Sequence, residues 1–590
     1  MRKKNIKKHK QQKTEKSLRL NLVLGVIFLL AGLIVFRLFN LQVINYNVFT
    51  EAAGKQHEIW SEVKAKRGEI FIEDYKEDNK YVLAGNKDLG LIYAVPLEIE
   101  DAQKTASLLS PILELSNEEL LQRLNKKNDL YEPLKRKVED EKVQEIQKLG
   151  LKGIGIQKEA WRYYPEKNFA SHVIGFLGYE GDQLKGRYGV EGFYNNILEG
   201  KAGFIAEERS AIGAWISVGR REVKQDIKGS DLILTLDRTV QYKAENLLKQ
   251  ALEKWGAESG TIIVMDPRNG AILALANLPD FDLNGYSKVE NVNIFNNSAI
   301  FDLYEPGSIF KPVVMGIALE THVVSPLTTY TDPCAVSIGG FTITNYNGKC
   351  YGLQNMTNVL EKSINTGMVF VARALGSEKM VNGLKTFGFD SLTGVDLDTE
   401  AQTILRSAEK WRETNLATAG FGQGIAVTPM QMAMAYSAIV NQGKLVKPHI
   451  IKKIIKHQED GSEIIEEIQP VFVGQVLSSS TAEKLSAMLV SVVENGFSKP
   501  ARVAGYLVGG KTGTAEVPDK IHGGYDEEKR ITSFAGFGPY EDPRFVILIK
   551  LDHSQSKGSV LIEGSTTCAP VFKELAKFLF DYYKIPPSEE

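Results

Sequence analysis

The sequence predicts an α/β fold for residues 228–585 of the 590-residue chain. Strand patterns open this segment at DLILTLD, SGTIIVMDP and AILALANL, with a tight turn expected at Arg268-Asn269-Gly270. Further strand patterns, KTGTAEV, SFAGFGP and FVILIKLDH, close it, and a mainly helical stretch at about 300–500 lies between the two sets. This order is typical of a sheet built from both ends of a segment, with a helical region inserted.

A chain of this length is too long for one core, and the composition changes along it support four regions. We expect a basic tail at 1–19, a transmembrane anchor at 20–43, a non-catalytic pedestal domain at 44–227 and the α/β domain at 228–585. The formal net charge of −2 gives no general attraction for polyanions, so no nucleic-acid partner is expected.

The expected anchor is the uncharged run from Leu20 to Phe36, LNLVLGVIFLLAGLIVF, which spans about 25 Å as a helix. A cleaved signal peptide is the alternative, but RLFNLQVINYNVF offers no small-x-small cleavage site. Nine Lys/Arg precede the run within residues 1–19, against one Glu. We therefore expect a single-pass membrane protein with its N-terminus in the cytoplasm and its other domains outside.

Short strands such as EIFIED and LGLIYAV are expected in the pedestal region. A charged helical stretch at roughly 100–150 should be broken by Pro111 and Pro133. The glycine-rich segment HVIGFLGYEGDQLKGRYGVEGFYNNILEGKAG follows, and nothing in it has the pattern of a catalytic cluster.

Two helix starts in the inserted region are well marked. Thr428, Pro429 and Gln431 form an N-cap, a proline at the first helical position and a capping-box glutamine, and the helix should end at Gly443. In EPGSIFKP, Gly307 can cap a helix that begins at Ser308.

Ser308 and Lys311 are separated by one helical turn, so the lysine amine can reach the serine hydroxyl. A serine is a poor nucleophile until a base removes its proton, and a lysine can do this if burial and nearby cations lower its pKa. Spacing alone is weak evidence, because Ser-x-x-Lys also occurs at Ser61, Ser407 and Ser554.

Histidine-based and metal-based chemistry has little support in the sequence. There is no Gly-x-Ser-x-Gly motif, and the eight histidines are scattered without His-x-x-x-His or Cys-x-x-Cys spacing. We therefore assign no histidine to catalysis and expect no metal or organic cofactor.

Two further motifs single out Ser308. KSINTG contains Ser363 and Asn365, and GGKTGTAE contains the Lys-Thr-Gly motif that begins at Lys511. Ser308, Ser363 and Lys511, in this order, form the three-part signature of the penicillin-recognising serine acyltransferases.

The chain resembles the class B penicillin-binding proteins, the monofunctional D,D-transpeptidases of peptidoglycan synthesis, from the anchor to about residue 580. The resemblance rests on KRGEIF, RYYPEKNFASHVIGF, GRYGVEGFYNNILEG, LTLDRTVQ, MDPRNGAILALANLPDFDLN and FGQGIAVTPMQMAMAYSAIVNQG. Departures are mild: Asp390 stands where a glycine is common, and Ile364 fills the variable place of Ser-x-Asn. The resemblance implies an antiparallel sheet flanked by helices, with an inserted helical region, on an elongated α+β pedestal.

The family's motif roles carry over to this chain as expectations. Ser308 attacks the penultimate D-alanine carbonyl of a donor stem peptide, Lys311 is the base and Ser363 relays a proton to the leaving D-alanine. Backbone N–H groups of Ser308 and Thr514 hold the oxyanion. Asn365 orients the donor backbone. The donor's terminal carboxylate is bound by the Lys-Thr-Gly-Thr stretch: Lys511, Thr512, Gly513 and Thr514.

The resemblance also implies partners. These are nascent peptidoglycan with D-Ala-D-Ala stem peptides, β-lactam antibiotics as covalent ligands, a separate membrane glycan polymerase, and the division or elongation machinery. The GRYGVEGFYNNILEG and FGQGIAVTP stretches favour the division type. The alternatives are a D,D-carboxypeptidase or β-lactamase-like hydrolase, and a catalytically silent β-lactam-binding scaffold or sensor.

Three cysteines are present, Cys334, Cys350 and Cys568. AVSIGGFTITNYNGK, between the first two, reads as two short strands turning at Gly339-Gly340, which would bring Cys334 and Cys350 together. An oxidising location outside the cytoplasm permits a bridge, whereas two separate buried thiols remain the alternative.

Overall fold

The computed structural model describes residues 22–45, 58–63, 65–126, 129–181, 183–208, 221–518, 525–555 and 562–588. The chain divides into two compact units, each treated separately below. The first comprises Met1–Ala65 and Lys201–Ile227, and the second comprises Lys66–Gly200 and Lys228–Glu590. The basic tail expected at 1–19 lies outside the described residues.

The first unit contains the helix expected near the N-terminus. It runs from Leu22 to Ile44, has a mean hydropathy of 2.7 and ends in a π-helical turn at Asn40–Ile44. By length and composition it can cross a membrane. The unit also contains a small antiparallel sheet of β1 (Glu58–Val63), β8 (Gly203–Glu208) and β9 (Arg221–Lys224).

The second unit is built around a five-stranded antiparallel sheet, which confirms the strands predicted at both ends of the α/β segment. Its order is β12-β11-β23-β22-β21. The strands are β11 (Ser259–Met265), β12 (Ile272–Leu278), β21 (Gly509–Pro518), β22 (Tyr525–Gly538) and β23 (Phe545–Ser554). β21, which carries Lys511, stands at one end of the order.

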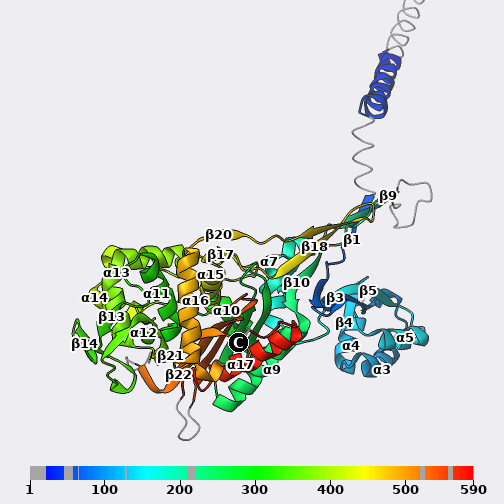
Figure 1. The fold of residues 1–590 in the computed structure, drawn as a ribbon. Coiled ribbons are helices and arrows are strands. Elements are labelled where there is room, and N and C mark those ends of the chain that lie inside the picture. The colour runs from blue at the N-terminus through cyan, green and yellow to red at the C-terminus, as the bar shows by residue number, and fades with distance from the viewer. Residues whose placement is uncertain are drawn as a thin grey trace, which may run out of the picture. The chain divides into compact units, whose positions relative to one another are not determined.

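Helices cover both faces of this sheet (Figure 1). α9 (Arg238–Trp255) and α17 (Cys568–Tyr582) pack on one face around Phe534, Phe572 and Phe580. α15 (Pro429–Val440) packs on the other face, beside the inserted helices α11 (Lys311–Glu320), α13 (Asn365–Thr386) and α16 (Ser479–Glu494). α15 is apolar all round and almost wholly buried, as expected for a central core helix.

The predicted start of α15 is confirmed. Gln431 N–H donates to Thr428 Oγ1 at 3.2 Å, and Thr428 N–H donates to Gln431 Oε1 at 3.0 Å. Pro429 occupies the first turn, where its missing N–H costs no helical hydrogen bond. The helix ends at Val440, three residues before Gly443.

A second, seven-stranded sheet has the order β19-β18-β10-β2-β3-β4, with β5 also paired to β3. Its strands are β2 (Ile70–Asp74), β3 (Glu77–Ala94), β4 (Glu132–Val138), β5 (Ile154–Tyr163), β10 (Asp231–Asp237), β18 (Ile451–His457) and β19 (Glu463–Glu467). β10 was expected in the catalytic sheet and lies here instead, parallel to β2 and antiparallel to β18. Its apolar residues are buried on both faces, which fits a central strand of either sheet.

α3 (Ala102–Leu113), α4 (Asn117–Leu124) and α5 (Asp140–Leu149) pack around a small separate core beside β3 and β4. The prediction that Pro111 breaks this stretch is wrong, because Pro111 lies inside α3. Its missing N–H removes one helical hydrogen bond, to the carbonyl of Ser107, and buried Leu113 anchors the turn that follows. Pro133 lies in β4.

Shorter elements complete the second unit. They are η2 (Pro96–Glu98), α6 (Ser171–Ile174), β6 (Phe176–Glu180), β7 (Gln183–Arg187), α7 (Gly189–Phe193), α8 (Asn195–Leu198), η3 (Tyr286–Lys288), η4 (Val292–Phe295), α10 (Ser298–Phe301), η5 (Gly307–Phe310), β13 (Thr329–Thr331), β14 (Ala335–Ile338), β15 (Phe341–Thr344), η6 (Tyr346–Gly348), β16 (Leu353–Asn355), α12 (Met356–Glu361), η7 (Ala408–Lys410), α14 (Glu413–Ala419), β17 (Lys444–Val446), β20 (Phe472–Gln475) and η8 (Lys499–Ala501).

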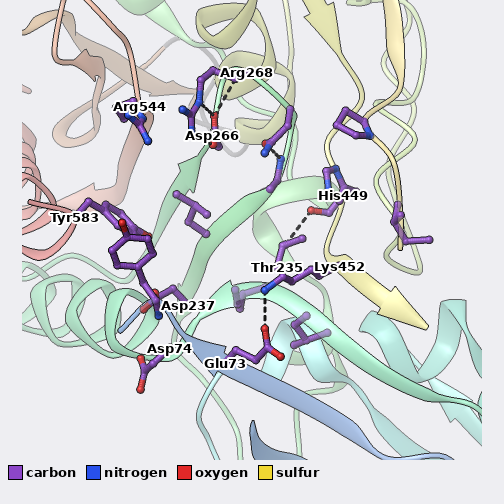
Figure 2. Close-up of a pocket in the computed structure, with 18 of the residues that line it drawn as sticks. Glu73, Asp74, Thr235, Asp237, Asp266, Arg268, His449, Lys452, Arg544 and Tyr583 are labelled. Carbon is purple, nitrogen blue, oxygen red and sulfur yellow. Dashed lines mark hydrogen bonds and ion pairs between the residues drawn. The ribbon is translucent and has the colours of Figure 1, made fainter. Parts of the chain in front are cut away.

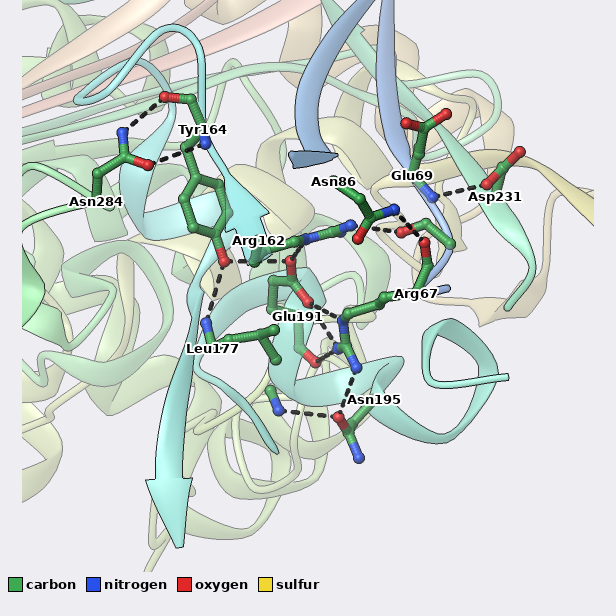
Figure 3. Close-up of polar contacts among 12 residues, drawn as sticks. Arg67, Glu69, Asn86, Arg162, Tyr164, Leu177, Glu191, Asn195, Asp231 and Asn284 are labelled. Carbon is green, nitrogen blue, oxygen red and sulfur yellow. Dashed lines mark hydrogen bonds and ion pairs between the residues drawn. The ribbon is translucent and has the colours of Figure 1, made fainter. Parts of the chain in front are cut away.

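A buried ionic cluster links the segment before β2 to the end of β5 and to α7 (Figure 3). Glu191, which is fully buried, accepts hydrogen bonds from Arg67 Nε at 2.8 Å, Arg162 Nε at 2.6 Å and Tyr164 Oη at 3.3 Å. Burial acts to raise the pKa of Glu191, but the two guanidinium groups outweigh it, so the pKa is lowered. The cluster therefore contains an ionised carboxylate between two cations, with almost no access to water.

Candidate active site

Ser308 lies on η5, a single 3₁₀ turn that passes directly into α11. The turn begins at Gly307, one residue earlier than predicted, and Gly307 is therefore part of it rather than its cap. Lys311 N–H donates to Ser308 O in the 3₁₀ pattern, which satisfies a carbonyl that Pro312 has no N–H to reach. Gly307 has φ of +56°, a conformation that suits glycine.

Lys311 lies beneath Ser308 and is fully buried. Its Nζ donates to Ser363 O at 2.7 Å, to Ser363 Oγ at 3.1 Å and to Asn365 Oδ1 at 2.8 Å. Ser363 Oγ in turn donates to Ser308 Oγ at 3.1 Å. Ser363 thus joins the nucleophile to the amine, and two of the three predicted motifs form one hydrogen-bonded chain.

The backbone at Ser363 is strained. Its φ is +51°, in the left-handed region that residues other than glycine enter at a cost of about 1–3 kcal/mol. This conformation presents both its carbonyl and its hydroxyl to Lys311. Asn365 follows as the first residue of α13, and its Nδ2 donates to Thr344 O at 3.0 Å.

The third motif reaches the site from β21. Lys511 is fully buried and donates to Thr512 O at 3.2 Å, while Thr514 is exposed. A side chain on Gly513 would lie 3.1 Å from Pro306 O and 3.0 Å from Ile309, so β21 packs closely against the turn that carries Ser308. The structure therefore brings all eight predicted residues to one place.

The two lysines have no carboxylate among the hydrogen-bond partners that the structure gives them. Burial, followed by the charge of Lys511, holds the pKa of Lys311 well below its usual value of 10.5. Burial lowers the pKa of Lys511 to about 7. A buried amine whose pKa is lowered in this way gives up its proton more readily and can then act as a base toward a hydroxyl.

The hairpin predicted between the cysteines is confirmed. β14 and β15 turn at Gly339 and Gly340, both with positive φ, and a disulfide joins Cys334 to Cys350 with a Cα–Cα distance of 4.6 Å. We refer to residues 334–350 as the disulfide loop.

Sequence reasoning missed Asp332, which holds the disulfide loop beside the site. Its carboxylate accepts hydrogen bonds from Thr366 Oγ1 at 2.7 Å, Asn345 Nδ2 at 2.9 Å, Tyr351 N at 2.9 Å and Cys334 N at 3.0 Å. Thr366 belongs to the first turn of α13, directly after Asn365. No motif marks Asp332 in the sequence, because its partners are distant or are backbone groups.

A second missed contact lies at β21, against residues 562–567, which precede α17. Gly564 N–H donates to Thr514 Oγ1 at 3.1 Å. A side chain on Gly564 would come within 2.5 Å of Gly513 O, so glycine is needed for this approach. The preceding residue, Glu563, accepts a hydrogen bond from Tyr346 of the disulfide loop.

A separate cavity of about 390 Å³ lies among the strands β2, β10 and β12 (Figure 2). Charged side chains of both signs line it, including Asp74, Asp237, Arg268 and Lys452, and most of them are paired with one another or with backbone groups. None of the eight motif residues is among its lining residues. The candidate site is therefore defined by its hydrogen bonds and not by this cavity.

Comparisons with known proteins identify the family. A family model described as the penicillin binding protein transpeptidase domain matches residues 260–577, and one described as the penicillin-binding protein dimerisation domain matches residues 62–234. Stage V sporulation protein D of Bacillus subtilis is 33% identical over 552 residues, which cover 92% of this chain and 83% of the relative. The probable peptidoglycan D,D-transpeptidase PenA of Neisseria meningitidis is 29% identical over 571 residues, covering 96% and 93%.

Solved structures are similar over nearly the same span. A peptidoglycan synthetase from Bifidobacterium adolescentis matches with a TM-score of 0.71 and 27% identity, covering 90% of this chain and 98% of that one. Penicillin binding protein 3 of Mycobacterium tuberculosis, solved with ampicillin, matches with a TM-score of 0.66 and 25% identity over the same shares. With both domain models in order and the three motifs assembled around one serine, the chain belongs to the class B penicillin-binding proteins.

Proposed function

We propose that this protein is a peptidoglycan D,D-transpeptidase that works through an acyl-enzyme on Ser308. The observation that carries the proposal is the hydrogen-bonded chain from Ser308 through Ser363 to the buried amine of Lys311. Relatives named as peptidoglycan D,D-transpeptidases, and a relative solved with ampicillin, support the substrate class.

In the acylation step, Lys311 in its neutral form takes the proton of Ser308, directly or through Ser363. Ser308 Oγ then attacks the carbonyl of the penultimate D-alanine of a donor stem peptide. The bond to the terminal D-alanine nitrogen breaks, and that nitrogen receives its proton through Ser363. Asn365 holds Lys311 in place and presents its amide to the donor backbone.

The oxyanion that forms is expected to lie between the backbone N–H groups of Ser308 and Thr514. One belongs to the 3₁₀ turn and the other to β21, and the two elements are in contact at Gly307 and Gly513. Two preorganised donors on rigid elements typically contribute about 10²–10³ each in rate.

The terminal carboxylate of the donor is the natural ligand of Lys511, Thr512 and Thr514, which offer a cation and two hydroxyls. Gly513 lets this strand lie close to the serine. β-Lactams carry a carboxylate at a corresponding position, so the same residues should bind them and Ser308 should be acylated by ring opening.

The acyl-enzyme is resolved by an amine from a second stem peptide. The amine nitrogen bonds to the acyl carbon, the bond to Ser308 Oγ breaks, and one amine proton returns to Ser308. The product is a peptide cross-link and the free enzyme, with no cofactor consumed.

We place the protein in the cell membrane through the helix Leu22–Ile44, with its N-terminus in the cytoplasm and the catalytic domain outside. Its partners in this setting are a membrane glycan polymerase and the machinery of division or elongation. We also propose that the pedestal domain ends near residue 227 and that the catalytic domain begins near residue 228.

Labelling with a fluorescent penicillin tests the proposal. The full chain in detergent should be labelled on Ser308, and S308A should fold normally but remain unlabelled. K311A should acylate at least about 10²-fold more slowly, since general bases contribute this much. S407A changes the serine of another Ser-x-x-Lys sequence and should label like the wild type. An adduct on a different serine in a tryptic digest would overturn the mechanism.

A further inference from the structure

Two segments lie beside motif residues of the site, and each is held by its own contacts; we call them the two walls. The first wall is the disulfide loop, fixed to α13 by Asp332 and by the bond from Asn365 Nδ2 to Thr344 O. The second wall is the segment 562–567, fixed to β21 by the bond from Gly564 N–H to Thr514 Oγ1. The motif residue Asn365 is hydrogen-bonded to the first wall, and the motif residue Thr514 is hydrogen-bonded to the second.

One side-chain contact bridges these walls. Tyr346 of the disulfide loop donates its hydroxyl hydrogen to Glu563 Oε1, across 217 residues of sequence. The other carboxylate oxygen of Glu563 accepts a hydrogen bond from Ser565 Oγ at 3.0 Å. Tyr346 is 46% exposed and Glu563 is half-buried, so the bridge is partly open to solvent.

The charge of Glu563 is unsuited to the donor. Both a D-Ala-D-Ala end and a penicillin carry a carboxylate, and the donor subsite offers Lys511 with two threonine hydroxyls to receive it. A second carboxylate next to Thr514 repels that group. The reactant whose charge complements Glu563 is the acceptor, because its attacking group is an amine that is protonated in water.

We propose that Glu563 binds the ammonium group of the acceptor stem peptide, and that Tyr346 holds the carboxylate across the mouth of the site until the acceptor replaces it. The proposal rests on the transpeptidase function proposed above and assigns Glu563 a role in acceptor specificity. The bound ammonium loses one proton to water before it attacks the ester on Ser308. The remaining step is the aminolysis already described, and Glu563 is neither oxidised nor acylated.

The test separates the donor step from the acceptor step in the full chain purified in detergent. The donor step is the rate of acylation by fluorescent penicillin. The acceptor step is the acceptor concentration that gives half-maximal cross-linking of a D-Ala-D-Ala pentapeptide. Two acceptors are compared, namely a tripeptide with one free side-chain amine and hydroxylamine, which is a largely uncharged nucleophile at neutral pH.

For E563Q we expect the half-maximal concentration of the tripeptide to rise about tenfold, the scale of a hydrogen bond to a charged group. The maximal rate should change less than about threefold, and hydroxylamine should be unaffected. Acylation by penicillin should become faster, because a like charge has been removed from the mouth of the site. A merely structural role would slow both steps, so an opposite change in the two is the signature of the proposal.

Y346F keeps the carboxylate of Glu563 but removes the tyrosine hydroxyl that competes with the acceptor for it. We expect it to lower the half-maximal concentration of the tripeptide about two- to threefold. E466Q, an exposed glutamate on β19, is the matched control and should change neither step. Added salt should weaken tripeptide binding in the wild type and much less in E563Q.

The inference falls if E563Q is acylated normally and has the wild-type half-maximal concentration, or if hydroxylamine and the tripeptide are affected equally. If the wild-type protein itself were not labelled by penicillin, the proposed function would be overturned instead. The two failures are therefore distinguishable.

Discussion

The amine of Lys311 lies 2.8 Å from the amide oxygen of Asn365, so an uncharged group stands where a carboxylate would fit with almost no change in shape. The amine is fully buried, and burial, followed by the charge of Lys511, holds its pKa well below the usual value.

We expect N365D to return Lys311 to its charged form. A carboxylate at hydrogen-bond distance favours the charged form of the amine and raises its pKa, so acylation at neutral pH should fall at least about tenfold. The acidic limb of the pH–rate profile should move to higher pH, with recovery in alkali, as measured by penicillin acylation.

N382D makes the same change on an exposed residue of α13 and should leave the profile in place. An equal loss at every pH in N365D would mean that the amide acts only on the donor.

K511M should make the protein inactive but more stable. Lys511 is buried beside Lys311, and its pKa of about 7 lies below the unfolded value near 10.5. Between these values the unfolded chain binds more protons, so this group's contribution to stability rises with pH from about 7 to 10.5. Below about pH 7 the cost of burying the charge is largest. The Tm of K511M should therefore exceed that of the wild type at pH 6–7, and the difference should shrink as pH rises.

K550M is the matched control. Lys550 is also buried on the catalytic sheet, but it forms an ion pair with Asp552. Its removal leaves a carboxylate without its partner, so the Tm should fall. A Tm of K511M below the wild-type value at pH 6 would contradict the prediction.

E191Q should destabilise the second unit strongly. It removes the charge that compensates Arg67 and Arg162, both of them mostly buried, and breaking such a group costs about 3–5 kcal/mol. The free energy of unfolding in urea measures this loss. E139Q removes an exposed pair with Lys87 and should leave the transition where it is.

Replacing both Cys334 and Cys350 with serine should loosen the disulfide loop. Bridging a loop of this length contributes about 3 kcal/mol. Amide hydrogen exchange in β14 and β15 should become about 10- to 100-fold faster. A reductant should have the same effect on the wild type and no further effect on the variant. Equal protection in both proteins would show that Asp332 alone holds the loop.

Local patterns predicted much of this molecule. Sequence patterns correctly predict the capping box of α15 and the glycine turn between β14 and β15. They also predict the strands β11, β12 and β21 to β23, because each pattern depends on residues a few positions apart. The motif residues were found for the same reason.

What could not be predicted depends on distant partners. β10 has the pattern of any buried strand, and its place beside β2 is decided by residues more than 160 positions away. The positive φ of Ser363 and the contact between Tyr346 and Glu563 have no sequence signature at all. Pro111 is different: a proline locally predicts a break in the helix, but the helix continues through it because its apolar side is buried.

The seven-stranded sheet that contains β10 can form only late in the synthesis of the chain. Its strands come from residues near 70, near 231 and near 451, and β10 pairs with the first and the last of these. A ribosome must therefore release residue 457 before β18 can complete the sheet, by which time Ser308 and its helix have long emerged. The pedestal region cannot complete its sheet as an independent nascent domain, because a chain that ends at residue 228 lacks β10 and would leave the edge of β2 open to aggregation.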